Sequence, residues 1–200
     1  MKSNVPVVIL AGGKNSRFYG VRNKAFLTFG KKRIIDLMLD VLGNIFSQII
    51  IITNTPSKFS EFKDVLILKD IVKNCGPIGG IYTGLKNINT QSAFLIACDI
   101  PFVNRKIIEK ILRFSNKEKD ITTIPISSKG FEPLFAVYNR EIISVLEKAL
   151  KKRELSIIKT VKKFPVRFIK LNEKEMQCLT NINTCFDLRK AECEFRNFEN

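Results

Sequence analysis

The chain has 200 residues, a net charge of +15, no histidine and 45% hydrophobic residues. This length suits one domain with a sizeable core, so we expect a single domain over residues 1–200. No apolar run is long enough to cross a bilayer, and the run Val5–Leu10 is too short for a signal-peptide core. These features predict a cytoplasmic protein that does not contact membranes.

The excess of positive charge does not by itself predict nucleic-acid binding. The basic residues are scattered along the chain apart from three short runs, whereas a nucleic-acid site gathers them into one stripe. A polyanionic small substrate, or merely a genome that favours Lys, Ile and Asn, would explain the excess, and we expect no nucleic acid. The cysteines form no C-x-x-C pair, and without histidine a zinc site is not expected. We interpret them as reduced structural thiols: Cys75, Cys98, Cys178, Cys185 and Cys193.

The opening segment carries the first functional signal. Val5–Leu10 is a continuous apolar run, typical of a buried parallel strand, and it leads directly into Gly12 and Gly13. Glycines lack a Cβ, so backbone amides there can approach an anion closely, and Arg17 and Lys24 follow with positive charge. The spacing fits neither a P-loop nor a dinucleotide fingerprint. The segment is either a phosphate-binding loop or a surface turn in a lysine-rich protein.

The next segments alternate between β-branched runs and helical periodicity. Gly43 and Asn104 have the residue types that end and begin helices. The expected elements are a helix over 34–42, strands over Gln48–Thr53, Val65–Leu68 and Ala93–Ala97, a loop between Lys69 and Gly80 that leads into a helix through Leu85, and a helix after Asn104 with Ile107, Ile108, Ile111 and Leu112 on its apolar face.

The second half is less regular. Its expected elements are strands over Ile121–Ile126 and Leu134–Tyr138 with a turn at Ser127–Gly130, a helix over Ile142–Leu150, a strand over Val166–Leu171, and a charged helix or frayed end from Asp187. Alternating strands and helices predict an α/β fold whose parallel sheet is covered on both faces.

Polar residues follow several of these strands. The Gly12 loop, Asn54, Asp70 and Asp99 would meet at the carboxyl edge of the sheet, where such folds bind ligands. Asp99 comes directly after a strand, and a carboxylate facing a phosphate loop suits Mg²⁺, which shares oxygen ligands with substrate phosphates. Asn54, Asp70 and Asn183 could bind sugar, base or metal, or they are ordinary turn residues.

Taken together, the motifs resemble one family. The glycine-rich opening is common to many nucleotidyltransferases, and the later segments are similar to the molybdenum cofactor guanylyltransferases. The matching segments are 10–17 with Lys24, Gly76–Ile81, Cys98–Phe102, Glu132–Tyr138 and Asn181–Thr184, in that order over nearly the whole chain. The resemblance implies a three-layer nucleotidyltransferase (Rossmann-like) sheet, mostly parallel, with helices on both faces.

The resemblance also implies an activity and its site. Such enzymes use Mg²⁺ to transfer GMP from GTP to the terminal phosphate of molybdopterin, releasing pyrophosphate, and molybdenum cofactor delivery proteins are possible partners. The implied nucleotide contacts are the backbone of Leu10, Ala11 and Gly12 with Lys24, Asn54, Asp70 and Asp99, with Asp99 as Mg²⁺ ligand, and Asn181 and Asn183 belong to the pterin side.

Three positions depart from the family pattern. The stretch from Arg17 to Lys24 is one residue longer than usual, and Asn23 stands where an aspartate commonly precedes the lysine. Cys185 replaces the proline that usually follows Asn-Thr, which alters the start of the last helix.

No covalent enzyme intermediate is needed, and the sequence indicates none, since the chain has no histidine and no serine in a nucleophile elbow. Catalysis then consists of positioning and charge stabilisation. We expect Lys24 at the α-phosphate, Arg17 and the Gly12–Gly13 amides at the leaving pyrophosphate, and Mg²⁺ on Asp99 between nucleotide and acceptor.

Two alternatives remain at this stage. A related enzyme would use CTP on molybdopterin or on a sugar-alcohol phosphate; Gly79 and Gly80, which would let a loop backbone approach a purine, favour guanine. A regulator that kept only the fold is disfavoured by the presence of both Lys24 and Asp99.

Overall fold

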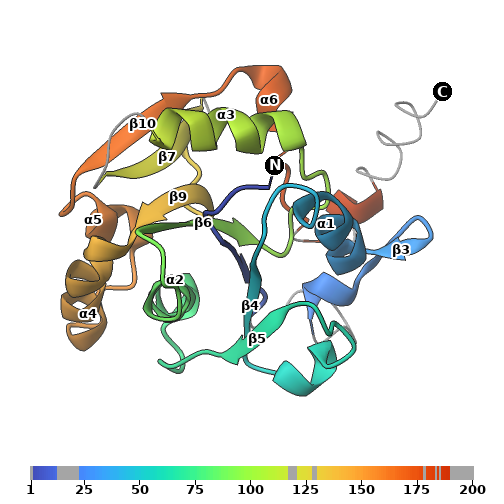
Figure 1. Cartoon of the computed structure of the whole chain (residues 1–200), viewed down its shortest axis with the longest axis horizontal. Helices are drawn as coiled ribbons and strands as arrows, with labels where there is room; N and C mark the ends of the chain where they lie inside the picture. Colours follow the sequence, from blue (N-terminus) through green and yellow to red (C-terminus); the bar gives the residue numbers. More distant parts are fainter. Residues whose placement is uncertain are drawn as a thin grey trace.

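The computed structural model describes residues 2–12, 23–116, 121–127, 130–177, 179–182, 184 and 186–189. Its main sheet has eight strands in the order β10-β7-β9-β6-β1-β4-β5, with β8 paired to β7 (Figure 1). The strands are β1 (Val7–Leu10), β4 (Ile49–Thr53), β5 (Leu66–Lys69), β6 (Ser92–Ala97), β7 (Thr122–Ser127), β8 (Gly130–Phe131), β9 (Phe135–Asn139) and β10 (Val166–Lys170).

Four of the seven strand pairs in the main sheet are parallel. β1 runs parallel to β4 and β6, β4 to β5, and β7 to β10, whereas β9 is antiparallel to β6 and β7. The mostly parallel α/β sheet is therefore confirmed. The carboxyl ends of β1, β4, β5 and β6 meet at one side of the sheet, which we call the carboxyl edge. The segment before β9 returns to that edge, because Ala97 N donates to Leu134 O at 2.9 Å.

Helices cover both faces of the sheet, each over its own apolar core (Figure 1). One face carries α1 (Ile34–Leu42), α3 (Arg105–Ser115) and α6 (Glu173–Gln177), and the other carries α2 (Gly76–Lys86), α4 (Ile143–Lys151) and α5 (Ile157–Val161). No helix in the described ranges is long and apolar enough to cross a membrane.

The helix ends follow the sequence signals. Gly43 N donates to Leu39 O at 2.9 Å where α1 ends, and the Asn104 side chain accepts from Lys106 N at 2.9 Å where α3 begins. All of the expected strands of the sheet are present. The pattern missed α5, α6, β8 and a small hairpin of β2 (Thr28–Phe29) and β3 (Lys32–Arg33), because these elements are too short to show periodicity.

The loop expected between Lys69 and Gly80 is a wrong prediction, because α2 already begins at Gly76. Glycines disfavour helices by roughly 1 kcal/mol each, but tertiary packing outweighs that cost here. A Cβ on Gly84 would lie 2.7 Å from Val8 Cγ1, and one on Gly80 would lie 3.0 Å from Leu10 Cδ2. The glycines let α2 lie directly against β1, which brings its first turn to the carboxyl edge.

Candidate active site

An ion pair joins the two residues expected to carry the chemistry. Lys24 opens a short 3-10 helix, η1 (Lys24–Phe26), and Asp99 lies just beyond β6. Lys24 Nζ is 3.1 Å from Asp99 Oδ2, and each side chain is 17% exposed. The other carboxylate oxygen, Asp99 Oδ1, is buried and has no hydrogen-bond partner among the described residues. The structure thus brings together two residues 75 positions apart.

The donor set at this point fits Mg²⁺. A buried carboxylate oxygen without a hydrogen-bond partner is an available ligand for a hard cation. In the described ranges no group of three or more His, Cys, Asp or Glu side chains could hold a metal. An ion on Asp99 would therefore complete its coordination with substrate phosphates and water, which is the usual arrangement for Mg²⁺.

The neighbouring thiol is not a nucleophile. Burial, reinforced by the negative charge of Asp99, raises the pKa of Cys98 to about 12. The thiol stays protonated at neutral pH, so Cys98 is structural. Cys75 is also a free thiol and is half-buried. The other three, Cys178, Cys185 and Cys193, lie outside the described residues.

The glycine turn after β1 meets the end of β4. An ideal Cβ on Gly12 would lie 3.3 Å from Asn54 Nδ2, so Asn54 packs against Gly12 and a larger residue here would have to displace the Asn54 side chain slightly. Leu10 contributes a side chain to the α2 interface and continues into Ala11, whose amide donates to Ile52 O at 2.8 Å. The expected residues Leu10, Ala11, Gly12 and Asn54 therefore form one unit.

Asp70 occupies a different part of the carboxyl edge, after β5. Its Oδ1 accepts from Thr83 Oγ1 at 2.8 Å and from Val72 N at 3.2 Å, which ties it to α2. A Cβ on Gly79 would lie 3.3 Å from both Asp70 carboxylate oxygens. The expected residues Asp70 and Gly79 are thus neighbours, and one oxygen of Asp70 already has a structural role.

The late segment also reaches the site. Ile182 N donates to Asp99 O at 2.8 Å, so the exposed Asn181 lies next to the segment that carries Asp99. Three expected site residues, Gly13, Arg17 and Asn183, lie outside the described residues.

Two supporting residues were not assigned a role from the sequence. Asn23 is only 7% exposed; its Nδ2 donates to Ala11 O at 2.9 Å and its Oδ1 accepts from Ala25 N at 3.0 Å. Thr53 Oγ1 donates to the same Ala11 carbonyl at 3.2 Å. The only signal for them was positional: Asn23 precedes Lys24, and Thr53 ends a strand.

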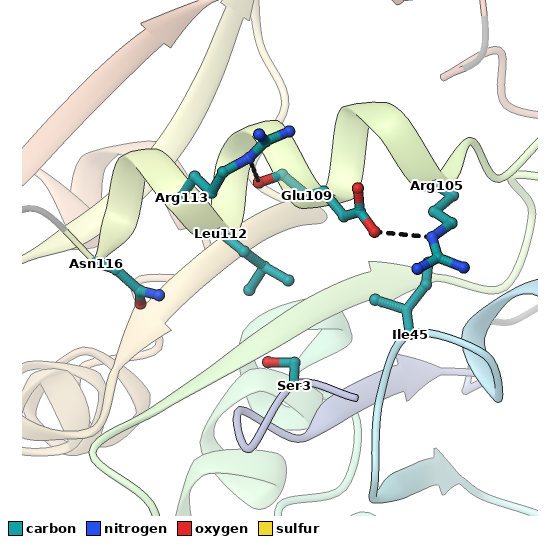
Figure 2. Close-up of a pocket in the computed structure, with 7 residues that line it drawn as sticks. All are labelled: Ser3, Ile45, Arg105, Glu109, Leu112, Arg113 and Asn116. Carbon is teal, nitrogen blue, oxygen red and sulfur yellow. Dashed lines mark hydrogen bonds and ion pairs between the residues drawn. The ribbon is translucent and has the colours of Figure 1, made fainter. Parts of the chain in front are cut away.

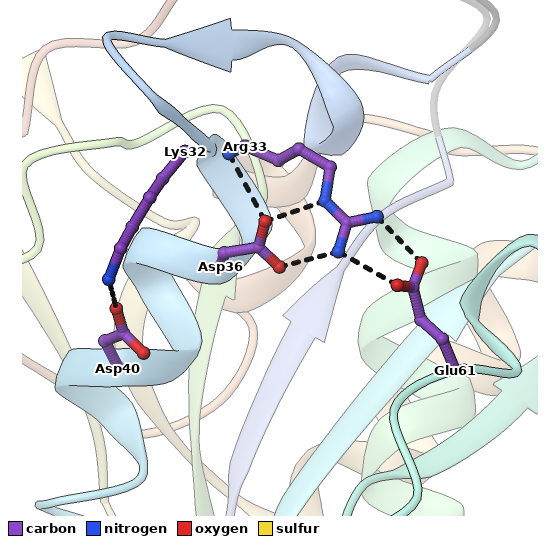
Figure 3. Close-up of polar contacts among 5 residues, drawn as sticks. All are labelled: Lys32, Arg33, Asp36, Asp40 and Glu61. Carbon is purple, nitrogen blue, oxygen red and sulfur yellow. Dashed lines mark hydrogen bonds and ion pairs between the residues drawn. The ribbon is translucent and has the colours of Figure 1, made fainter.

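A second polar cluster, formed by Arg33, Asp36 and Glu61, packs against the 3-10 helix that carries Lys24. The Arg33 guanidinium forms paired hydrogen bonds with Asp36 at 2.7 and 2.8 Å and with Glu61 at 2.7 and 3.1 Å (Figure 3). It also lies 5.6 Å from the ring centre of Phe26, two residues after Lys24. These contacts raise the pKa of Arg33, with the hydrogen bond to Asp36 as the largest cause, and the bonds to Arg33 lower the pKa values of Asp36 and Glu61.

Two hollows of the described surface lie away from these residues. One, of about 390 Å³, runs along α3 and is lined by Ser3, Ile45, Arg113 and neighbouring residues (Figure 2). Another, of about 430 Å³, lies between α3 and β10. Ser3 and Ile45 precede β1 and β4, so the first hollow includes the amino ends of the strands. None of the residues expected to bind nucleotide lines either hollow.

Comparison with known proteins identifies the family of the chain. Residues 7–164 match the model of the MobA-like NTP transferase domain. The chain is 34% identical over 183 residues to a probable molybdenum cofactor guanylyltransferase of Clostridium perfringens, covering 88% of this chain and 90% of that one. It is 33% identical to the molybdenum cofactor guanylyltransferase of Desulfosudis oleivorans, covering 94% and 95%.

The fold agrees as well. The crystal structure of molybdopterin-guanine dinucleotide biosynthesis protein A from Archaeoglobus fulgidus superposes with a TM-score of 0.83 at 25% identity, covering 96% of this chain and all of that chain. The family match covers most of the chain, and both relatives are more than 30% identical to it. Together they show the family. The chain belongs to the MobA-like nucleotidyltransferase family, among the molybdenum cofactor guanylyltransferases.

Proposed function

We propose that this chain transfers GMP from GTP to the terminal phosphate of molybdopterin and releases pyrophosphate, forming the guanine dinucleotide form of the molybdenum cofactor. The observation that carries this proposal is the Lys24–Asp99 pair beside the Gly12 turn, with Asp99 Oδ1 available to a metal. The names of the relatives supply the identity of the two substrates.

The reaction needs one bond to form and one to break. A phosphate oxygen of the acceptor attacks the α-phosphorus of GTP, and the bond to the bridging oxygen of the β-phosphate breaks as pyrophosphate leaves. The acceptor oxygen is already anionic, so no strong base has to remove a proton. Lys24 stabilises the charge that builds on the α-phosphate oxygens, and Arg17 with the Gly12–Gly13 amides holds the departing phosphates.

Asp99 would hold Mg²⁺, which supplies Lewis-acid activation of the phosphoryl group and charge neutralisation. Before substrate binds, Lys24 neutralises Asp99 across 3.1 Å. A bound triphosphate offers Lys24 a second anion, so Lys24 can turn towards the α-phosphate, and both oxygens of Asp99 would then be available to hold Mg²⁺. The ion pair thereby keeps both groups in place until the nucleotide arrives.

Base selection is expected to involve the first turn of α2. The exposed amide of Gly76 has no partner within the helix, whereas the carbonyls of this turn accept from amides further along the helix. The first turn of α2 therefore offers a hydrogen-bond donor, which suits guanine O6. An open loop at this place would have offered both donors and acceptors. Acceptors for the guanine N1–H and N2–H₂ edge would be side-chain oxygens such as Asp70 Oδ2 and Asn54 Oδ1.

The remaining assignments follow from the same proposal. Asn181 and Asn183 would contact the pterin, and molybdenum cofactor delivery proteins would receive the product. We further propose that residues 1–200 act as one domain in the cytoplasm.

The test is a competition of the four nucleoside triphosphates for the purified protein in the presence of Mg²⁺. We expect GTP to bind at least about tenfold more tightly than CTP or ATP, because unpaired polar groups in a closed pocket penalise the wrong base. A preference for CTP would replace guanylyl transfer with cytidylyl transfer and leave the roles of Lys24 and Asp99 in place.

A further inference from the structure

One backbone carbonyl at the site receives two side-chain hydrogen bonds. Ala11 O accepts from Asn23 Nδ2 at 2.9 Å and from Thr53 Oγ1 at 3.2 Å. All three residues are buried, with exposures of 1% for Ala11, 7% for Asn23 and 0% for Thr53. The donors come from two elements, the cap of η1 and the end of β4, and they converge on the peptide that joins Ala11 to Gly12.

This arrangement fixes the direction of the next amide. In a trans peptide the C=O and N–H groups point in opposite directions, and the described part of the chain contains no cis peptide. Because the Ala11 carbonyl points inwards at Asn23 and Thr53, the Gly12 N–H points outwards. Gly12 is exposed, and no described group accepts from its amide.

The Asn23 carboxamide donates one hydrogen bond and accepts another. Its Oδ1 accepts from Ala25 N at 3.0 Å, and its Nδ2 donates to Ala11 O. An aspartate would keep the acceptor and lose the donor, and an alanine would lose both. Because Ala25 follows Lys24 in η1, Asn23 fixes the helix that carries Lys24 to the peptide that presents the Gly12 amide.

We propose that Asn23 and Thr53 are positioning residues that aim the Gly12 amide at the bound nucleotide and hold it in register with Lys24. This inference rests on the proposed nucleotidyl transfer and deepens it by naming what preorganises the site. An amide that is already oriented before substrate binds stabilises developing charge without reorganising during the reaction. The departure of Asn23 from the usual aspartate then has a physical role in this chain.

The test separates the hydrogen bond that Asn23 donates to Ala11 O from the one that it accepts as the cap of η1. Asn23→Asp retains the cap and removes the donor, and Thr53→Val removes the second donor while keeping the shape of the side chain. Asn139→Asp is the matched control, because Asn139 is also a buried cap of a 3-10 helix and accepts from Glu141 N at 2.7 Å, at the opposite edge of the sheet. Thr53→Ser restores the hydroxyl as a rescue variant.

The first readout is the hydrogen-exchange rate of the Gly12 amide, measured by NMR. It is measured without nucleotide and with the triphosphate that wild type binds most tightly. In wild type we expect the bound nucleotide to slow exchange at Gly12. In Asn23→Asp and Thr53→Val we expect saturation with nucleotide but exchange at Gly12 close to that of the free protein. A merely structural role would change the melting temperature without this local difference.

The second readout is kcat and KM. Each single variant is expected to lose about tenfold in kcat/KM, mainly in kcat, with partial recovery in Thr53→Ser and less than about twofold change in Asn139→Asp. Equal protection of the Gly12 amide in wild type, Asn23→Asp and Thr53→Val would overturn the inference, as would equal losses in Asn139→Asp. Thr53→Val decides the matter if Asn23→Asp fails to fold. A different result would contradict the proposed function and not this inference: wild type would bind nucleotide and protect the Gly12 amide but transfer no GMP.

Discussion

Asp99→Asn separates what the carboxylate does for catalysis from what it does for stability. Asparagine keeps the shape and removes the charge. In the free protein the change removes an ion pair between groups that are each 17% exposed, and it also replaces a buried oxygen that has no described partner. An interaction of that kind contributes about 1–3 kcal/mol, and relief of the buried charge offsets part of it. We therefore expect the melting temperature to change by no more than about 4 °C.

Turnover should change far more. In the proposed mechanism the charged carboxylate would hold the metal next to the reacting phosphate, and a lost contact to a charged group costs about 1.5–3 kcal/mol. The upper end of this range corresponds to a fall of about 100-fold in the rate.

The assay is pyrophosphate release at saturating Mg²⁺ with GTP and molybdopterin, with the melting curve measured on the same samples. A rate within about threefold of wild type, equivalent to about 0.7 kcal/mol in the barrier, would refute the assignment of Asp99 as the metal ligand.

Three further changes have defined outcomes. Lys24→Ala should lower the single-turnover rate by more than it lowers GTP affinity in calorimetry, since Lys24 acts where charge develops; the reverse pattern would make it a binding residue only. Gly84→Ala should destabilise the fold by about 1–3 kcal/mol in urea unfolding, because its Cβ would lie 2.7 Å from Val8 Cγ1, and unchanged stability would contradict this packing. Arg33→Met should weaken the dependence of the free energy of unfolding on pH in the acid range. Because Arg33 lowers the pKa of Asp36, their pairing stabilises the folded state above about pH 4, and this stabilisation is lost as the pH falls through the folded pKa. Wild-type and variant profiles that run parallel over this range would contradict the pairing.

The parallel core of the fold was predictable because its signals are strong and local. Val7–Leu10 and Ile49–Thr53 are buried apolar strands, and α3 buries the four apolar residues that its periodicity indicates. The α2 start was missed because glycine is a poor helix former by intrinsic propensity. What places Gly80 and Gly84 in a helix is contact with β1, and that contact cannot be read from the local sequence.

The site was predictable at the level of which residues meet. Asp99 and Lys24 were expected at one edge of the sheet, because the Gly12 segment and Asp99 each follow a strand and because of the family resemblance, and the structure pairs them. The second role of Asp70, bound by Thr83, and the hydrogen bonds of Asn23 were not predictable, because they depend on the exact approach of α2 and η1 to the strands. A residue type indicates what a side chain can bond to, and only the fold determines which partner it meets.

The most direct measurement is the product of the reaction. Purified protein would be incubated with Mg²⁺, molybdopterin and either GTP or CTP, and the dinucleotide and pyrophosphate formed would be quantified by mass spectrometry and a coupled assay. We predict one pyrophosphate for each guanine dinucleotide formed from GTP, with little product from CTP. Formation of the cytosine dinucleotide in preference, or no GMP transfer by a sample that binds GTP, would contradict the proposed guanylyl transfer.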